Sequence, residues 1–201
     1  AADLGIAVFS APEGNAQAVA EHAMAMLLCL SNQLLSADRT LREGDWLREP
    51  HRGWEIAGKT LGIIGHGNNG SAFARLWKGW PVRVLAHDKY VSEFGNDTVT
   101  ECDLDRVLNE SDIISLHIPL TEETHEYLND AFLSRCKQGV VIINTSRGKV
   151  IDLKALLDAL RSGKVAGACL DVLPYEPPLK GPDHFQILFH ELIAKENVVL
   201  S

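Results

Sequence analysis

Three polar residues follow apolar runs in the second half of the chain. Arg147 comes after the run 140–144, Asp171 follows the run 166–170, and Glu176 stands five residues further on. A guanidinium group can hold a carboxylate through two hydrogen bonds and polarise the neighbouring carbonyl group. A carboxylate such as Glu176 can pair with an imidazole that serves as acid and base. Each residue alone could be an ordinary loop residue, but together they indicate a site for a carboxylate-bearing carbonyl compound.

A glycine-rich turn lies in the middle of the chain, between the apolar run 61–64 and a segment with helical spacing. It reads Gly65-His66-Gly67-Asn68-Asn69-Gly70, and a second apolar run, 82–86, then leads to Asp88. In this strand, turn, helix and strand order the glycines let the backbone approach a pyrophosphate, whose charge the helix N-terminus attracts. The acid accepts hydrogen bonds from a ribose. The pattern predicts a dinucleotide site, the alternative being a purely structural turn.

The acid at the end of the second run also bears on the choice of dinucleotide. A carboxylate at Asp88 would repel the 2′-phosphate of NADP, so the sequence favours NAD. His87 and Lys89 flank this acid and weaken that argument, unless they are ordinary solvated residues.

The elements that position these residues alternate regularly from residue 59 onward. Strands are expected at 61–64, 82–86, 112–119, 140–144, 166–170 and 198–200, and helices after Gly70 and around 104–108, 130–136, 152–163 and 185–193. The acidic stretch near 93–97 is expected to be a surface loop. This alternation predicts an α/β fold with a doubly wound parallel sheet, a Rossmann-type core over 59–201 within one dinucleotide-binding domain over 1–201.

The first 58 residues carry a different pattern. A short strand over 6–9, a turn and a single long helix from Ala16 to about Arg42, capped by Asn15, are expected there, followed by a polar connection that contains tryptophan. The helix is apolar on more than one face. It is therefore either an interior helix or one that packs against another subunit, and the segment 1–58 is a possible dimer arm.

Composition excludes several classes of protein. The chain has 201 residues, 46% of them hydrophobic, and a formal net charge of −8, which opposes binding to nucleic acid. Its four cysteines show no zinc-ligand or disulfide spacing, so we expect no metal and a reduced, cytoplasmic protein. The longest apolar run, 23–30, is too short to span a membrane. Because the chain starts at Ala1 without a methionine, it is expected to be a fragment or a partly ordered protein.

Several motifs resemble those of the D-isomer-specific 2-hydroxyacid dehydrogenases: VAEHAMAMLL, GKTLGIIGHGNNG with Asp88, SLHIPLTEET, INTSRGKVID and GACLDVLPYEPP. The stretch GHGNNGSAFA is most similar to the D-3-phosphoglycerate dehydrogenase group of that family. The resemblance implies that Arg147 is the catalytic arginine and that Glu176 orients the catalytic histidine. It implies dinucleotide contacts from Gly65, Gly67, Asn68, Asn69, Gly70, Asp88, Ile118, Pro119, Thr145, Ser146 and Asp171. Asp171 would receive the nicotinamide amide.

Two positions depart from the family pattern. Asn69 stands where the family usually has an apolar residue, which affects how the start of the helix packs. The catalytic histidine is expected directly after the last strand, beyond Ser201, and the first half of the substrate domain before Ala1. His117 matches a position on the cofactor side, whereas His184 and His190 are expected on the surface of the last helix.

The leading hypothesis is an NAD-dependent oxidoreductase that transfers a hydride between NAD(H) and a D-2-hydroxy acid or its 2-keto partner. The best guess for its substrate is 3-phosphoglycerate, which would place it in serine biosynthesis. An alternative is an NAD(H)-sensing binding protein like the corepressors built on this fold. A methyltransferase would leave the SRG and DVLPYEP stretches unexplained. The resemblance also suggests a homodimer, with no nucleic acid or membrane partner.

Overall fold

The chain is built around a seven-stranded parallel sheet with strand order β3-β2-β1-β4-β5-β6-β7. The computed structural model describes residues 4, 7, 9, 11 and 13–201. The strands are β1 Thr60–Ile64, β2 Arg83–His87, β3 Val99–Glu101, β4 Ile113–Leu116, β5 Val140–Asn144, β6 Val165–Leu170 and β7 Val198–Leu200. All six pairings are parallel. The sequence order reverses between β1 and β4, which confirms the predicted doubly wound sheet.

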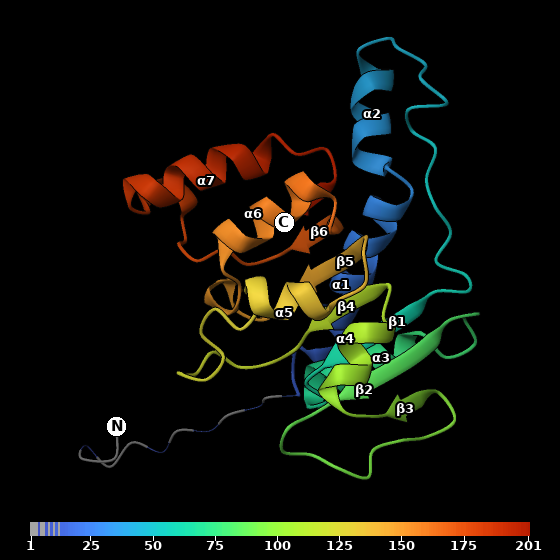
Figure 1. Cartoon of the computed structure of the whole chain (residues 1–201), viewed down its shortest axis with the longest axis vertical. Helices are drawn as coiled ribbons and strands as arrows, with labels where there is room; N and C mark the ends of the chain where they lie inside the picture. Colours follow the sequence, from blue (N-terminus) through green and yellow to red (C-terminus); the bar gives the residue numbers. More distant parts are fainter. Residues whose placement is uncertain (1–3, 5–6, 8, 10, 12) are drawn as a thin grey trace.

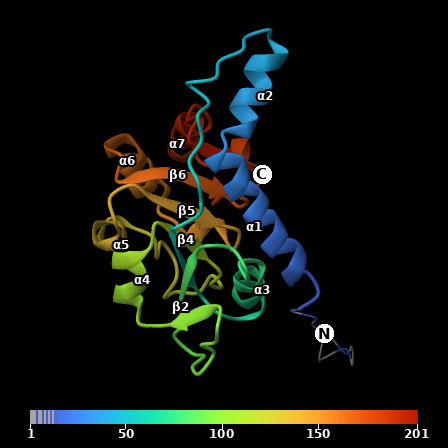
Figure 2. The same cartoon turned by 90° about the vertical axis from the view of Figure 1, so that its right-hand side faces the viewer.

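Helices cover both faces of this sheet, as Figure 2 shows with α1 and α3 on one side and α4, α5 and α6 on the other. The helices are α1 Ala16–Ser31, α2 Leu34–Arg42, α3 Asn68–Leu76, α4 Leu104–Glu110, α5 Asp130–Arg135, α6 Leu153–Ser162 and α7 Asp183–Ile193. The short 3-10 turns η2 Gly148–Val150 and η3 Pro178–Lys180 lie in the loops. Successive strand residues point to opposite faces, so Leu61 and Ile63 pack with α1 and α3 while Ile64 packs with the opposite helices.

The predicted single helix from Ala16 to Arg42 is wrong. Helix α1 ends at Ser31, Gln33 takes a left-handed conformation with φ 52°, and α2 starts at Leu34. The two helices meet at a bend of 60°. The Asn32 side chain donates to the carbonyl of Leu28 at 3.0 Å, and this local bond competes with the helix ladder at the break. Asn15 does occupy the predicted N-cap position of α1, but its side chain makes no capping hydrogen bond.

Helix α1 has seven buried residues among its 16, whereas α2 has no buried residue. Figure 1 shows α2 and the connection that follows it extending away from the sheet, and Figure 2 agrees. Among the described residues no single helix is long and apolar enough to cross a membrane; the bent pair α1–α2 meets the criteria of length and composition when taken together.

The remaining predictions concern individual strands and the ends of helix α6. Strand β3 was not predicted, and the strand expected over 112–119 covers only Ile113–Leu116. The capping predicted for α6 is confirmed, because Asp152 accepts from the backbone N–H groups of Lys154 and Ala155, and Gly163 ends the helix at φ 72°. The strand expected over 6–9 includes Ile6 and Val8, which lie outside the described residues.

Candidate functional site

The predicted site residues gather along one edge of the sheet because of the strand register. Ile64 pairs with both His87 and Leu116, Leu116 pairs with Asn144, and Asn144 pairs with Leu170. These five residues therefore form one row at the carboxyl ends of five neighbouring strands. The loops that follow these five strands therefore all leave the sheet at the same edge. Ligands of open α/β sheets bind outside this edge, at the point where the strand order reverses.

The glycine turn after β1 has two kinds of glycine. A Cβ atom at Gly70 would lie 1.9 Å from the carbonyl oxygen of Gly65, so the chain itself requires glycine there. Gly67 has φ −74°, which any residue can adopt, and a Cβ atom there would have no heavy atom within 4 Å. Gly67 thus leaves open space at the N-terminus of α3. This cradle fits the pyrophosphate of a dinucleotide.

The carboxylate of Asp88 is held by three backbone N–H groups. Its Oδ2 accepts from His66 at 2.7 Å, and its Oδ1 accepts from Tyr90 at 2.8 Å and from Val91 at 2.9 Å. Burial raises the pKa of Asp88, but the three hydrogen bonds outweigh this effect and keep its pKa below the ordinary value. An ionised Asp88 lies ready to accept hydrogen bonds from ribose hydroxyl groups.

Next to Asp88 the structure has a cavity of about 410 Å³. It is lined by Ile64, Gly65, Gly67, His87, Asp88, Lys89, Tyr90, Leu104, His117, Ile118, Pro119, Thr121, Glu123, Thr124 and Tyr127. The predicted cofactor residues Ile118 and Pro119 thus share its wall with the glycine turn and the acid. A larger hollow of about 530 Å³, lined by residues such as His125, Lys149 and His184, contains none of the predicted site residues.

His87 and Lys89, the two residues that flank Asp88, both have partners. Lys89 donates to Glu123, and the hydroxyl group of Tyr90 donates to the other oxygen of Glu123 at 3.0 Å. The Nδ1 atom of His87 lies 3.2 Å from the carbonyl oxygen of Cys102. Glu123 thus offsets the positive charge of Lys89, which could otherwise attract the 2′-phosphate of NADP. The repulsion of that phosphate by Asp88 is therefore less opposed than the sequence alone indicates, and NAD is favoured.

His117 follows β4 and packs behind the glycine turn. Its Nε2 atom lies 2.8 Å from the hydroxyl oxygen of Ser115, and its ring centre lies 5.2 Å from that of Phe73. Burial, with a smaller contribution from His66, lowers the pKa of His117 to about 4. His117 is therefore neutral at neutral pH and is not the acid and base of a reaction near pH 7.

This shift predicts acid sensitivity. Between pH 6.5, its ordinary pKa, and pH 4 the unfolded chain binds a proton at His117 that the folded chain does not. The free energy of unfolding should therefore fall as the pH falls through this window, by about 1 to 2 kcal/mol at pH 5 for a partly exposed ring. Urea unfolding at pH 7 and pH 5 measures this loss, and His117→Asn should reduce it. An NMR titration in which the His117 ring titrates above pH 6 would contradict the prediction.

The loop after β5 brings together Thr145, Ser146 and Arg147. The Oγ1 atom of Thr145 is buried and has no hydrogen-bond partner among the described residues, which suits a contact with a bound cofactor. The hydroxyl group of Ser146 instead donates to Oδ1 of Asn144 at 2.7 Å. Arg147 is exposed, and its Nη1 donates to the carbonyl oxygen of Ser146 at 2.7 Å.

Asn144 is a residue that the sequence analysis missed. It is fully buried at the end of β5, its Oδ1 accepts from the backbone and the hydroxyl group of Ser146, and its Nδ2 donates to the carbonyl oxygen of Arg147 at 3.0 Å. Asn144 therefore fixes the loop that carries the arginine. An amide at the end of an otherwise apolar strand is the signal that could have pointed to it.

Asp171 starts the loop after β6, and its backbone N–H donates to the carbonyl oxygen of Asn144 at 3.1 Å. It thus lies beside the loop that carries Arg147. Its carboxylate lies 3.3 Å from the Nε2 atom of His22 on α1, a neighbour that the sequence did not predict. Glu176 lies further along the same loop, with an exposed side chain that has no polar partner within the described part of the chain.

The two asparagines at the start of α3 differ in exposure. Asn68 is exposed, and its carbonyl oxygen accepts from the hydroxyl group of Ser71 at 3.2 Å. The Oδ1 atom of Asn69 is buried without a hydrogen-bond partner among the described residues, at the position where the family usually has an apolar residue. The described residues hold no cluster of three or more His, Cys, Asp or Glu side chains arranged for a metal ion.

Comparison with known proteins places these features in one family. Residues 24–201 match the family model described as "D-isomer specific 2-hydroxyacid dehydrogenase, NAD binding domain". The chain is 37% identical over 199 residues to the D-3-phosphoglycerate dehydrogenase of Archaeoglobus fulgidus, covering 98% of this chain and 37% of that protein. It is 41% identical over 202 residues to the hydroxypyruvate reductase of Thermotoga maritima, covering 100% of this chain and 63% of that protein.

Solved structures agree with the sequence relatives. The D-lactate dehydrogenase of Aquifex aeolicus, crystallised with NAD and lactic acid, superimposes with a TM-score of 0.87 at 35% identity, over 99% of this chain and 62% of that one. The chain thus spans less than two thirds of the length of these relatives. From the family match and the glycine turn together, we conclude that this chain belongs to the D-isomer-specific 2-hydroxyacid dehydrogenases as their NAD-binding domain.

Proposed function

We propose that the whole encoded protein transfers a hydride between NAD(H) and carbon 2 of a D-2-hydroxy acid or its 2-keto partner. The observation that carries this proposal is the row of strand ends that sets Arg147 and Asp171 at the same edge as the glycine turn. NAD, when bound, supplies or accepts the hydride. The glycine turn and α3 would hold its pyrophosphate, Asp88 its ribose, and Thr145 and Asp171 its nicotinamide end.

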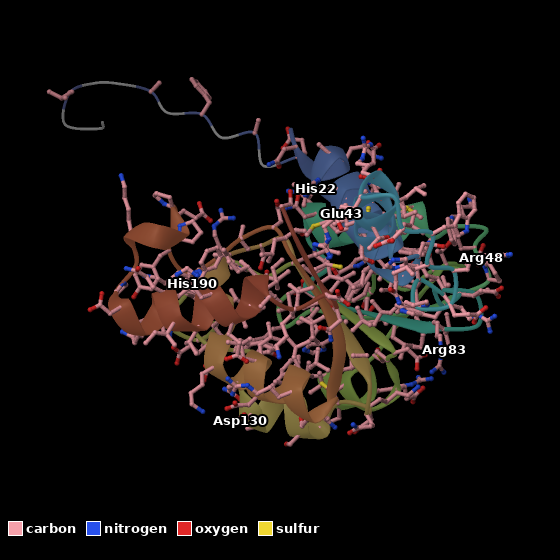
Figure 3. All side chains as sticks on the ribbon, turned by 90° about the horizontal axis from the view of Figure 1, so that it is seen from above. His22, Glu43, Arg48, Arg83, Asp130 and His190 are labelled. Atoms are coloured by element: carbon pink, nitrogen blue, oxygen red, sulfur yellow. The ribbon has the colours of Figure 1, made fainter. Side chains whose placement is uncertain are left out.

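Arg147 and Glu176 would act on the substrate side. The guanidinium group of Arg147 would hold the substrate carboxylate and polarise the carbonyl group that becomes the alcohol. Among the described residues it forms one hydrogen bond, to Ser146, so four of its five N–H donors have no partner there and can serve such a ligand. Glu176 would orient a histidine that donates or accepts the proton. The exposed His184 and His190 lie on α7 instead, and Figure 3 labels His190 there.

We further propose 3-phosphoglycerate as the substrate. The support is the resemblance of GHGNNGSAFA to the D-3-phosphoglycerate dehydrogenase group, together with several relatives of that name. Relatives named hydroxypyruvate reductase and glyoxylate reductase share similar identity, so the test must compare acids. With phosphohydroxypyruvate, hydroxypyruvate, glyoxylate and pyruvate offered in parallel, we expect the highest kcat/KM for the phosphorylated acid. A preference for a smaller acid would overturn this substrate assignment and leave the reaction class intact.

A homodimer through the α2 arm is also proposed. The arm, residues 34–58, has no buried residue on α2 and exposes Leu34, Leu35, Leu41, Trp46 and Leu47. Such an unpartnered apolar surface suits a second copy of the chain. Light scattering should show a dimer, and Leu41→Glu should shift it towards monomer, while the control Asp38→Asn on the same helix should not. A monomer for the unmodified chain at high concentration would contradict the proposal.

The contact between Glu123 and Lys89 gives a prediction on cofactor choice. Removing the charge with Glu123→Gln frees Lys89 to attract a 2′-phosphate, so the preference for NADH over NADPH should fall by about three- to tenfold in low salt. Fluorescence titration with both cofactors measures the ratio. Glu122→Gln removes the same charge at the adjacent exposed position and should leave the ratio unchanged. An equal change in both variants would mean that only the net charge matters.

A further inference from the structure

His22 lies where α1 meets the end of β6. Helix α1 packs against the face of the sheet formed by β5, β6 and β7, which brings His22 next to the first residue of the loop that follows β6. Its Nε2 atom is 3.3 Å from Oδ1 of Asp171, and this atom is shielded from solvent although the side chain as a whole is 42% exposed. Figure 3 labels His22 on α1, well away from His190 on α7.

The charged group next to the shielded Nε2 atom of His22 is the carboxylate of Asp171. Nε2 makes no hydrogen bond within the described residues, and the contact with Asp171 is within ion-pair distance. Leaving a buried polar atom without a partner costs free energy, and the Asp171 carboxylate is the acceptor that lies next to Nε2. The Asp171 carboxylate accepts no hydrogen bond in the described part of the chain, and its charged neighbour there is His22.

We infer that His22 is a positioning residue for Asp171 and, through it, for the nicotinamide end of the cofactor. This inference rests on the proposed role of Asp171 as acceptor for the nicotinamide amide. The backbone N–H of Asp171 is already tied to Asn144, so its main chain is fixed and its side chain is the part left to orient. With Oδ1 directed to His22, Oδ2 is free for the carboxamide N–H group. The adenosine end of the site, at Asp88, does not involve His22.

The test separates the two ends of the cofactor. For the 201-residue chain, affinities for NADH and for ADP-ribose, which lacks the nicotinamide, are measured by calorimetry on the wild type and on His22→Leu. We expect the Kd of NADH to rise about tenfold and the Kd of ADP-ribose to stay within about twofold. His22→Gln retains an N–H donor and should restore most of the NADH affinity. His190→Leu removes an exposed histidine from α7 and should change neither affinity.

A double variant tests whether His22 acts through Asp171. Asp171→Asn alone should weaken NADH binding, and adding His22→Leu to it should weaken binding no further, because the carboxylate that His22 orients is gone. Additive losses would overturn the inference. The inference would also be overturned if His22→Leu lost the same affinity for NADH as for ADP-ribose and had a lower melting temperature. That pattern would mean that His22 only packs α1 against the sheet.

Two remaining outcomes are also decisive. If His22→Leu fails to fold, His22→Ala, which also removes the N–H donor, takes its place in the Asp171 and Asp171→Asn backgrounds and gives the same coupling. If the wild-type chain binds ADP-ribose and NADH equally well, Asp171 does not hold the nicotinamide and the inference fails with it. If the wild-type chain binds neither ligand, the proposed dinucleotide site itself is wrong, a result distinct from failure of the His22 role.

Discussion

Gly67→Ala should fold normally and bind NADH about 100-fold more weakly, whereas Gly70→Ala should lose stability as well as binding. A methyl group at Gly67 meets no heavy atom within 4 Å and its φ of −74° suits alanine, so folding has no reason to change. The methyl group does occupy the space through which a pyrophosphate reaches the N–H groups of α3, and two lost charge-assisted hydrogen bonds account for about 3 kcal/mol.

Gly70 gives the matched contrast within the same turn. A methyl group there would lie 1.9 Å from the carbonyl oxygen of Gly65, so the backbone must move, and we expect the free energy of unfolding to fall by about 3 kcal/mol. Urea unfolding and NADH titration of both variants separate the two effects. Tight NADH binding by a well-folded Gly67→Ala chain would show that the cofactor does not lie on this turn.

Arg147→Ala should lower kcat/KM of the whole protein by about 10²- to 10³-fold, comparable to the loss of one preorganised donor to a developing oxyanion. The Kd of NADH should change little, because Arg147 is exposed and its one hydrogen bond within the described chain is to the neighbouring Ser146. Arg147→Lys keeps the charge without the two-pronged geometry and should recover only part of the rate.

Steady-state kinetics and NADH binding on the same samples of the arginine variants provide the check. Lys149→Ala, two residues away and also exposed, serves as the control and should leave kcat/KM within about twofold of wild type. Unchanged turnover in Arg147→Ala would remove this arginine from the mechanism.

The features that the sequence predicted well are those carried by short-range patterns. The glycine turn is recognisable because a strand precedes it and a helix follows it, and Asp88 stands at the end of the next strand. The cap of α6 at Asp152 follows the same local logic, since the side chain bonds to N–H groups two and three residues on. Such arrangements depend on neighbours in the chain and can be read from the residues alone.

The features that the sequence missed depend on long-range packing or on weak local signals. The break between α1 and α2 at Gln33 falls in a segment without glycine or proline, the residues that most often mark the end of a helix. The Asn32 side chain stabilises this break in part. Strand β3 has only three residues and forms because β2 offers it an edge. The contact of His22 with Asp171 joins residues at opposite ends of the chain, which no local pattern specifies.

The sequence predicted which residues of the loop after β5 belong to the site, but not the hydrogen bonds that they form. Asn144 holds the loop that carries Arg147, and it accepts a hydrogen bond from the hydroxyl group of Ser146, a residue that the resemblance assigns to the cofactor. Ser146 would then contact the cofactor through its backbone or after a change of its side-chain rotamer. Thr145, in contrast, has a buried hydroxyl oxygen without a hydrogen-bond partner in the described part of the chain. The assignments of Arg147, Glu176 and the individual cofactor contacts stay predictions.

Oxidation of NADH by the whole encoded protein tests the proposed reaction most directly. The protein is offered the four 2-keto acids in parallel, with absorbance at the NADH band as the readout and the Arg147→Ala variant alongside. The proposed function predicts NADH consumption with at least one of these acids, fastest with phosphohydroxypyruvate, and a large loss of rate in the variant. Saturable NADH binding without turnover of any acid would contradict it and would favour a protein that senses NAD(H) instead.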